Sequence, residues 1–386
     1  LLGLVGSEMC IRDRSLSSCG GGGGGDSSPR ARDKGTISGI VFDAPVTQAV
    51  VTAYEYQNGK VGRKLGSATT SPYGEYSIEV DASSMPLYIE AKGGAYKDPL
   101  TDDIVETSEG KPIRIVSVIN YGEGNDQDVM ITPLTYMVTG LAEYKIKNGT
   151  EASSAIDEAL NTINAMYGFN VNSVKPIDIT RGGISGSATE GHRYGALLTA
   201  YSSYAYDFID ENGNAGNVYS SLNLSDIGYR DISADGYLNG QELDRTGSFS
   251  EPIYFGIEEV TSDTYTNQMA EHTLVVVSDP NLNVSKTPID DYLAMTEHLN
   301  ALGTNGSADG AIPEREETVI DDQPPVATRS DEGVLKGIAS IDVALTDAVG
   351  VKSASVTLRH KFDEGDSWSE SACSSTPNEG DICWVD

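Results

Sequence analysis

The chain has 386 residues, with 58 Asp and Glu against 26 Lys and Arg, which gives a formal net charge of −32 and a pI of about 4.3. A charge of this sign opposes nucleic acid and anionic membrane surfaces, so we expect no nucleic-acid partner. No apolar run reaches the roughly 18 residues that a membrane-spanning helix needs. The hydrophobic content of 38% suits ordinary folded cores, and the length allows about two to four domains.

The first segment, residues 1–14, is charged where a signal peptide would need an apolar core. Its sequence resembles the in-frame translation of a sequencing-library adapter. We therefore expect residues 1–14 to be an adapter-derived artefact, and residues 15–35 to hold a truncated lipoprotein signal followed by a Gly/Ser tether. The alternative is a natural polar N-terminus.

Residues Leu16-Ser17-Ser18-Cys19 precede a tract of glycine and then Asp26-Ser27-Ser28-Pro29. Chains rich in Gly and Ser behave as random coils, so this composition suits a flexible tether. The stretch resembles the end of a bacterial lipoprotein signal peptide. The resemblance implies that Cys19 carries a lipid anchor to a membrane and that the chain lies in the bacterial cell envelope, at the outer membrane and exposed at the surface. The alternative is a glycine linker with an incidental cysteine.

Residues 36–128 predict an all-β sandwich. Thr36–Phe42 and Ala49–Tyr54 are β-branched runs, and Asn58-Gly59 is a strong hairpin signal because both positions accept positive φ. Apolar residues alternate with polar ones on two later strands, at Tyr76, Ile78 and Val80 and at Leu87, Ile89 and Ala91. Several short strands separated by turns are typical of a sandwich.

Three segments of this region, Ile37–Val41, Ala49–Tyr54 and Thr70–Tyr76, resemble the carboxypeptidase regulatory-like domain, a small transthyretin-like sandwich. Ser71 stands where the family usually has Asp, which weakens the side-chain hydrogen bond of that turn. The resemblance covers about a quarter of the chain. It implies no catalytic residues.

Residues 129–302 predict a mainly α-helical domain. Thr132-Pro133 places a capping side chain before a proline at the first helical position, and Gly149 is expected to end that helix. Thr150 is expected to cap a second helix that Gly168 ends. Further helices are expected at Thr189–Ile209, Tyr265–Val277 and Pro288–Leu302. Residues 210–250 are polar and rich in glycine, and we expect them to form an insertion.

Residues 303–333 are rich in Gly, Asn, Pro and acidic side chains without an apolar period, and they predict a linker. The segment Gly337–Val351 resembles the opening of a bacterial immunoglobulin-like repeat, so residues 334–386 are expected to hold a partial immunoglobulin-like sandwich. Cys373 and Cys383 fit a disulfide formed in an oxidising compartment. The expected fold is therefore multidomain, an all-β sandwich followed by a helical domain and a partial immunoglobulin-like β-sandwich.

The sharpest chemical motif is Asp231–Glu242, which follows the twelve-residue calcium loop of EF-hands. The residues at its ligand positions are Asp231, Ser233, Asp235, Tyr237 through its carbonyl, Asn239 and Glu242. A hard cation prefers such oxygen ligands, so Ca²⁺ is the expected cofactor. Ser233 lowers the ligand charge, and the flanking residues form poor amphipathic helices. The alternative is a polar turn.

Four histidines, His192, His272, His298 and His360, are scattered without a metal-binding or catalytic spacing, and no catalytic residue is expected. The sequence predicts a non-enzymatic, surface-exposed bacterial lipoprotein, adhesin-like or a modular scaffold, with an extracellular protein or carbohydrate as its ligand. Two alternatives stay open. The chain would hold the N-terminal accessory modules of a truncated secreted hydrolase, or it would be a periplasmic ligand-binding lipoprotein.

Overall fold

The computed structural model describes residues 34–81, 84–106, 113–181, 186–208, 220–241, 252–256, 258–307 and 310–314, and the backbone of four short strands between 326 and 372. The chain forms two compact units. The first consists of Leu1–Gly303 and Ser307–Pro313, and the second of Thr304–Gly306 and Glu314–Asp386.

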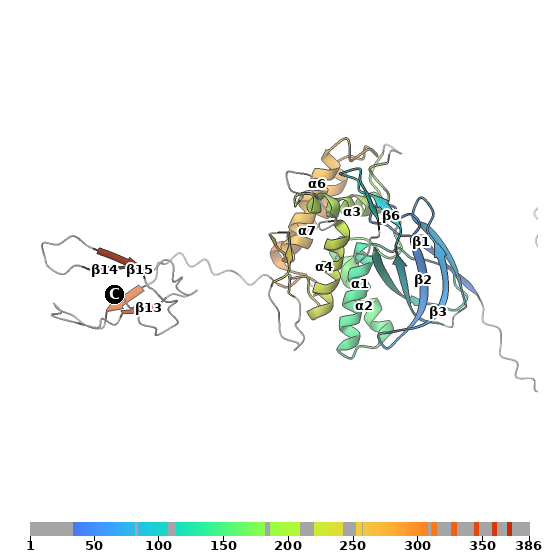
Figure 1. Ribbon diagram of the computed structural model, residues 1–386, viewed down its shortest axis with the longest axis horizontal. Coiled ribbons are helices and arrows are strands. Elements are labelled where there is room, and N and C mark those ends of the chain that lie inside the picture. Colours follow the sequence, from blue (N-terminus) through green and yellow to red (C-terminus); the bar gives the residue numbers. More distant parts are fainter. Residues whose placement is uncertain are drawn as a thin grey trace, which may run out of the picture. The chain divides into compact units, whose positions relative to one another are not determined.

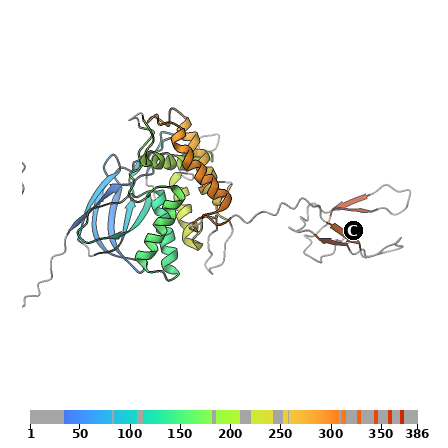
Figure 2. The same ribbon diagram turned by 180° about the vertical axis from the view of Figure 1, so that it is seen from behind.

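The β-part of the first unit consists of two sheets and a short hairpin. The strands are β1 (Gly35–Ile40), β2 (Val50–Gln57), β3 (Lys60–Thr69), β4 (Glu75–Val80), β5 (Met85–Lys92), β6 (Ala95–Lys97), β7 (Ile104–Glu106), β8 (Arg114–Tyr121) and β9 (Gln127–Asp128). One sheet has the order β4-β1-β9, the other has the antiparallel order β3-β2-β5-β8, and β6 pairs with β7. In Figures 1 and 2 the strands occupy one side of the unit and the helices the other.

The β2–β3 hairpin confirms the turn that the sequence predicts. Gln57 pairs with Lys60, and Asn58 and Gly59 have φ values of 51° and 73°. Two central residues at positive φ match the twist of the flanking strands, which is why Asn-Gly is favoured there. The alternation on β4 is also confirmed, because Tyr76, Ile78 and Val80 are buried and the residues between them are exposed.

The helices of the first unit follow these strands in sequence, with an antiparallel pair, β10 (Tyr254–Phe255) and β11 (Glu258–Glu259), between the fourth and fifth helices. They are α1 (Pro133–Lys147), α2 (Ala152–Tyr167), α3 (Glu190–Tyr206), α4 (Ser221–Asp235), α5 (Ser262–Tyr265), α6 (Asn267–Ser278) and α7 (Asp290–Asn305). Thr132 caps α1 with Pro133 at its first position, and Gly168 ends α2 at a φ of 78°, as predicted. The cap of α2 is Glu151 rather than Thr150, because the Glu151 carboxylate accepts the backbone N–H groups of Ser153 and Ser154.

Helix α4 lies inside the segment that the sequence analysis expected to be a polar insertion, so that expectation is wrong for Ser221–Asp235. Ser220 and Asn223 form a capping box at its start, and Gly236 ends it at a φ of 89°. Local capping therefore supports a helix whose apolar period is weak. The helix packs against α1 where Gly140 allows close approach, because a Cβ there would lie 2.8 Å from the Tyr229 carbonyl oxygen.

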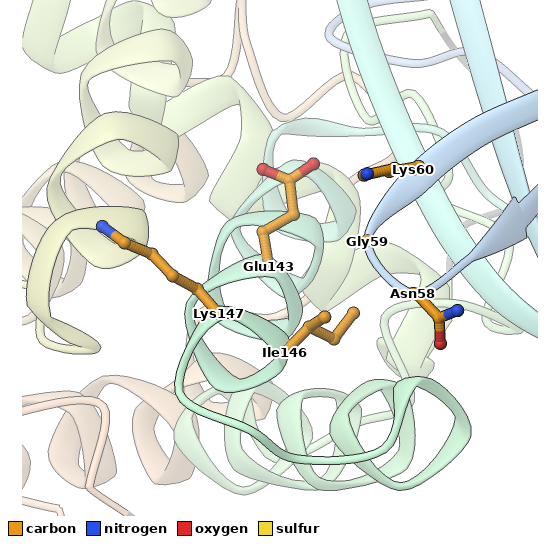
Figure 3. Close-up of a pocket in the computed structure, with 6 residues that line it drawn as sticks. All are labelled: Asn58, Gly59, Lys60, Glu143, Ile146 and Lys147. Carbon is orange, nitrogen blue, oxygen red and sulfur yellow. The ribbon is translucent and has the colours of Figure 1, made fainter.

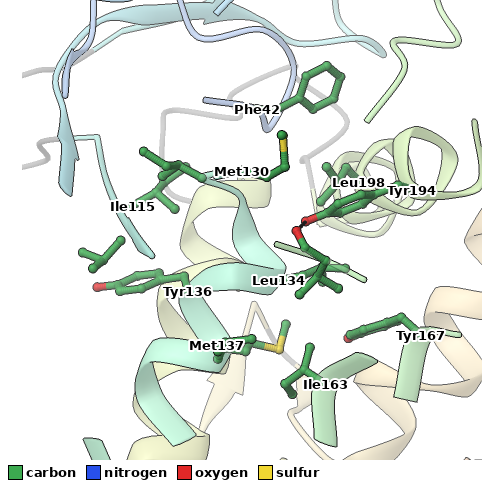
Figure 4. Packing of buried hydrophobic residues seen from close by; sticks show 14 of the residues in the cluster. Phe42, Ile115, Met130, Leu134, Tyr136, Met137, Ile163, Tyr167, Tyr194 and Leu198 are labelled. Carbon is green, nitrogen blue, oxygen red and sulfur yellow. Dashed lines mark hydrogen bonds between the residues drawn. The ribbon is translucent and has the colours of Figure 1, made fainter. Parts of the chain in front are cut away.

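Helix α1 joins the sheets to the other helices. Residues 129–131 continue along β1, with Val129 N–H donating to Ser38 O and Ile131 N–H to Ile40 O. The first ten residues of α1 are buried, as expected for a helix surrounded by other elements. Figure 4 shows its Leu134 and Met137 among buried side chains of the sheet and of other helices. The boundary predicted between residues 128 and 129 therefore falls inside one compact unit with a shared core.

Beyond Glu314 the second unit is described only through four short strands. They are β12 (Val326–Arg329), β13 (Val343–Thr346), β14 (Thr357–His360) and β15 (Ser369–Ala372). Antiparallel pairs join β12 to β13 and β14 to β15. Strand β13 falls in the segment that resembles an immunoglobulin-like repeat, and β12 lies within the stretch expected to be a linker. The immunoglobulin-like assignment stays a prediction.

Candidate functional site

A pocket lies between the β2–β3 turn and the C-terminal half of α1 (Figure 3). The turn supplies Asn58, Gly59 and Lys60, and the helix supplies Glu143, Ile146 and Lys147. Its volume is about 390 Å³, and Asn58, Gly59, Lys60 and Lys147 are exposed, so it is an open pocket at the surface. We call it the Glu143 pocket.

Local structure explains why these residues meet. Positions 143, 146 and 147 are three and four residues apart, so they share one face of α1. The helix emerges from the core at this point, since its buried run ends at Ala142. The hairpin turn approaches that face closely, because a Cβ on Gly59 would lie 3.1 Å from Ile146 Cγ2. The pocket is the space left beside this contact.

Glu143 is the partly buried acid of the pocket. The Tyr229 hydroxyl of α4 donates to its Oε2 at 2.5 Å, while no described group donates to Oε1. Burial raises the pKa of Glu143 above its ordinary value, and the Tyr229 hydrogen bond and the charge of Arg114 oppose that shift. The carboxyl is therefore held in one orientation with one oxygen left to accept.

A network of tyrosines and one arginine packs beside Glu143 and fixes the position of Tyr229. The Tyr229 and Tyr136 rings are stacked, with centroids 4.2 Å apart and an interplanar angle of 8°. Arg114 Nη1 donates to the Tyr136 hydroxyl at 2.7 Å, and Arg114 Nε donates to Glu90 Oε1 at 2.7 Å. Its Nη2 donates to the Tyr88 hydroxyl. Fixed partners of this kind keep a site in one geometry before a ligand arrives.

The lysines of the pocket are not engaged in ion pairs with any part of the chain that the structure describes. In Figure 3 the Lys60 ammonium points across the pocket toward the side of Glu143, and Lys147 extends away from it. Lys60 and Glu143 thus present opposite charges across the opening without forming an ion pair. The Tyr56 hydroxyl nearby is buried and has no hydrogen-bond partner among the described residues. Burial raises the pKa of Tyr56, and the negative charge of Glu143 adds to the rise.

The predicted calcium residues are arranged differently from an EF-hand loop. Asp231, Ser233 and Asp235 lie on α4, so the expectation of a loop beginning at Asp231 is wrong for this stretch. The Ser233 hydroxyl donates to the Arg230 carbonyl oxygen. Glu242, the last predicted ligand, lies outside the described residues. Calcium binding at this segment stays a prediction.

The two aspartates stabilise the turn that follows α4. Asp231 is buried, and its two oxygens accept the backbone N–H groups of Gly240 at 3.0 Å and Gln241 at 3.2 Å. Burial raises the pKa of Asp231 to about 7, and these hydrogen bonds oppose the shift. Asp235 accepts from Tyr237 N–H at 2.8 Å and from the Asn239 side-chain amide at 3.1 Å.

A second fully buried aspartate, Asp43, links the β-part to the start of α4. Its Oδ2 accepts the Ser221 hydroxyl at 2.5 Å, and its Oδ1 has no partner among the described residues. Burial raises the pKa of Asp43 to about 7, and the negative charge of Asp98 adds to the shift. Asp43 is 1% exposed, and its hydrogen bond with Ser221 joins elements that are distant in sequence.

His272 lies between a serine and an aspartate, a combination that the sequence analysis did not foresee. Its Nδ1 is 2.9 Å from Ser203 Oγ, and its Nε2 is 3.5 Å from Asp207 Oδ2. Ser203 is buried, whereas the Asp207 side chain is 63% exposed. A hydrolytic triad needs the serine to face the substrate. Here the serine is buried and the aspartate is exposed. This cluster therefore packs α3 against α6.

The remaining predicted site residues are untested by the structure. Cys19, Cys373 and Cys383 lie outside the described residues. Within the described ranges, no group of three or more His, Cys, Asp and Glu side chains is placed to hold a metal ion. None of the helices in those ranges is long and apolar enough to cross a membrane.

Sequence reasoning missed the Glu143 pocket. The Asn58-Gly59 turn was recognisable, and so was the spacing of Glu143, Ile146 and Lys147 on one helix face. Nothing local connects the two segments, which are more than 80 residues apart in the chain. Their proximity depends on the path of residues 129–131 along β1.

Comparison with known proteins gives no family. No protein-family description and no curated protein matches this chain. A solved structure, the 9R-lipoxygenase from Cyanothece PCC8801, aligns with 35% of this chain and 25% of its own at 14% identity. Its TM-score is 0.18, so the similarity carries no argument about fold or activity.

Proposed function

We propose that this chain is a non-enzymatic, surface-exposed bacterial lipoprotein that binds an extracellular ligand in the Glu143 pocket. The binding role rests on one observation: Lys60 and Glu143 carry opposite charges, form no ion pair with each other, and line a pocket of about 390 Å³. The lipoprotein-like stretch at Cys19 supports attachment to the cell envelope. The acidic composition agrees with a protein kept soluble outside the cell.

Binding is favoured over catalysis by the chemistry of the pocket. Its described lining contains one carboxyl and no hydroxyl or thiol side chain that would act as a nucleophile. Glycoside hydrolysis in its usual form needs a second carboxyl, which the described lining does not supply. A single oriented carboxyl facing a cation suits recognition.

Attachment to the membrane is tested by growing the native host with radiolabelled palmitate. The protein should carry the label, and Cys19→Ser should lose it while being made in similar amounts. Protease added to intact cells should degrade the parent protein. An unlabelled parent protein, or one that protease reaches only after the cells are broken, contradicts this part of the proposal.

Ligand binding in the pocket is tested by thermal unfolding of the full chain against a panel of amino acids, sugars and organic acids. A ligand that binds only the folded chain raises the melting temperature. We expect at least one class to do so in the parent and much less in Glu143→Gln. Lys64→Met, an exposed lysine on the same strand as Lys60, serves as the control and should respond as the parent does. The binding role fails if no class changes the melting temperature.

A further inference from the structure

The charges of the Glu143 pocket face each other without pairing. No salt bridge joins Lys60 to Glu143, and neither forms one with another described residue, although the charge of Arg114 acts on Glu143. A ligand that bridges them must offer an anionic or accepting group to Lys60 and a cationic or donating group to Glu143.

We propose that the Glu143 pocket takes a zwitterionic ligand of the amino-acid type, with its ammonium at Glu143 and its carboxylate at Lys60. This inference rests on the proposed function and names the ligand class of the same site. The Glu143 end is suited to an ammonium because Tyr229 fills Oε2 and no described donor occupies Oε1. Charge-assisted hydrogen bonds of this kind are stronger than neutral ones.

The Lys60 end of the pocket lies on the β2–β3 turn, whose backbone is fixed by the Gln57–Lys60 pair and by the positive φ values of Asn58 and Gly59. The Asn58 side-chain amide points away from the Lys60 ammonium (Figure 3), so Lys60 alone would meet the carboxylate.

The rest of the lining fits the aliphatic part of such a ligand better than it fits a sugar ring. Ile146 supplies an apolar side chain to the lining, on the face of α1 that the turn approaches. The described lining has no aromatic ring face on which a saccharide would stack. We therefore choose an amino acid with an aliphatic side chain as the probe.

The test is isothermal titration of the full chain with four probes, L-leucine, N-acetyl-L-leucine, L-leucinamide and D-glucose. N-acetylation removes the ammonium charge and amidation removes the carboxylate charge, while both keep the side chain. Leucine should bind. Each capped form should bind at least about tenfold more weakly, because each loses one charged contact with the pocket. These comparisons use the parent chain and do not depend on the folding of a variant.

Two substitutions assign the ends. Glu143→Gln should weaken leucine at least about tenfold and leave the weak binding of N-acetyl-leucine unchanged. Lys60→Met should weaken leucine similarly and leave leucinamide unchanged. Lys64→Met should bind all four probes as the parent does.

The outcomes separate this inference from the binding role. Glucose binding that depends on Glu143, with no binding of leucine, overturns the zwitterion and leaves the binding role standing. Leucine binding that is equal in Glu143→Gln and the parent overturns the zwitterion at this site. Absence of binding by all four probes also overturns it, and the wider panel then decides whether the pocket binds anything.

Discussion

Glu143 and Asp231 are acids on two helices that pack together, α1 and α4, yet their surroundings differ. Both oxygens of Asp231 accept backbone N–H groups of the turn after α4, and the residue is fully buried. Glu143 Oε2 accepts a hydrogen bond from the Tyr229 hydroxyl, and Glu143 lines the pocket with its Oε1 free of described donors. A raised pKa alone does not distinguish them, since burial raises the pKa of both.

The difference shows what separates a structural acid from one that a ligand can use. A carboxyl whose acceptor positions are filled by backbone N–H groups fixes a turn, and its removal leaves those donors unsatisfied. A carboxyl with a spare oxygen at an opening has capacity left for a partner. We therefore expect substitutions at Asp231 to affect stability and substitutions around Glu143 to affect binding.

Asp231→Ala should give the largest effect. It leaves the N–H groups of Gly240 and Gln241 without their acceptor in a buried setting, which should lower the free energy of unfolding by about 2–4 kcal/mol. Urea unfolding of the full chain measures this loss. Asp226→Ala is the control on the same helix, because its exposed ion pair with Arg230 should contribute less than about 1 kcal/mol. Equal losses in the two variants would contradict the structural role of Asp231.

Asp43→Asn tests the second buried carboxyl through pH. The folded pKa of Asp43 is about 7 and its ordinary value is 3.8, so between these values the folded chain binds more protons than the unfolded one. Stability from this group is therefore complete below pH 3.8 and is lost as the pH rises toward 7. The parent should lose about 2 kcal/mol relative to Asp43→Asn between pH 5 and pH 8. If the difference in the free energy of unfolding between parent and variant stays constant over this pH range, the pKa of Asp43 is not raised.

Gly140→Ala should push apart α1 and α4, the helices that carry Glu143 and Asp231. The new Cβ would lie 2.8 Å from the Tyr229 carbonyl oxygen and 2.9 Å from Ile232 Cγ2. Overpacking should outweigh the gain in helix propensity and lower the free energy of unfolding by about 1 kcal/mol. Thermal unfolding measures it, with Asn161→Ala on the exposed face of α2 as the control. A stabilised Gly140→Ala would show that the helices are not in close contact here.

The β-part was the most predictable from sequence because its signals are local. The Asn58-Gly59 turn and the alternation of Tyr76, Ile78 and Val80 depend on backbone preference and on a period of two. The Thr132-Pro133 start of α1 is equally local, since a cap and a proline act within one turn. Each of these features is found in the structure.

The candidate site was not predictable, because it depends on contacts between distant segments. The oxygen-rich pattern from Asp231 resembled a calcium loop, with Ser233 as a departure, but the same pattern suits a helix capped by Ser220 and ended by Gly236. Capping and packing against α1 favour the helix. The pocket needs Lys60 and Glu143 to meet, and Tyr229 to approach from a third segment. No period or motif in the sequence encodes that meeting.

Tyr229→Phe should give the smallest change in stability, and it tests directly whether Glu143, unlike Asp231, serves ligand binding. It keeps the ring stacked on Tyr136 and removes only the hydroxyl that donates to Glu143, so the free energy of unfolding should fall by only about 0.5 kcal/mol. The hydrogen bond lowers the pKa of Glu143, so its loss should raise that pKa further. Leucine binding needs the ionised carboxyl under our inference, and affinity should fall as the pH falls through the pKa of Glu143.

In Tyr229→Phe this loss of affinity should begin at a higher pH than in the parent, which titrations across a pH series would show. Tyr237→Phe is the matched control, because Tyr237 is 40% exposed and its ring lies outside the pocket lining. A pH profile in Tyr229→Phe identical to the parent's would mean that Glu143 does not hold the ammonium. A changed profile with unchanged stability would show that Tyr229 tunes the site and does not merely fill space between α1 and α4.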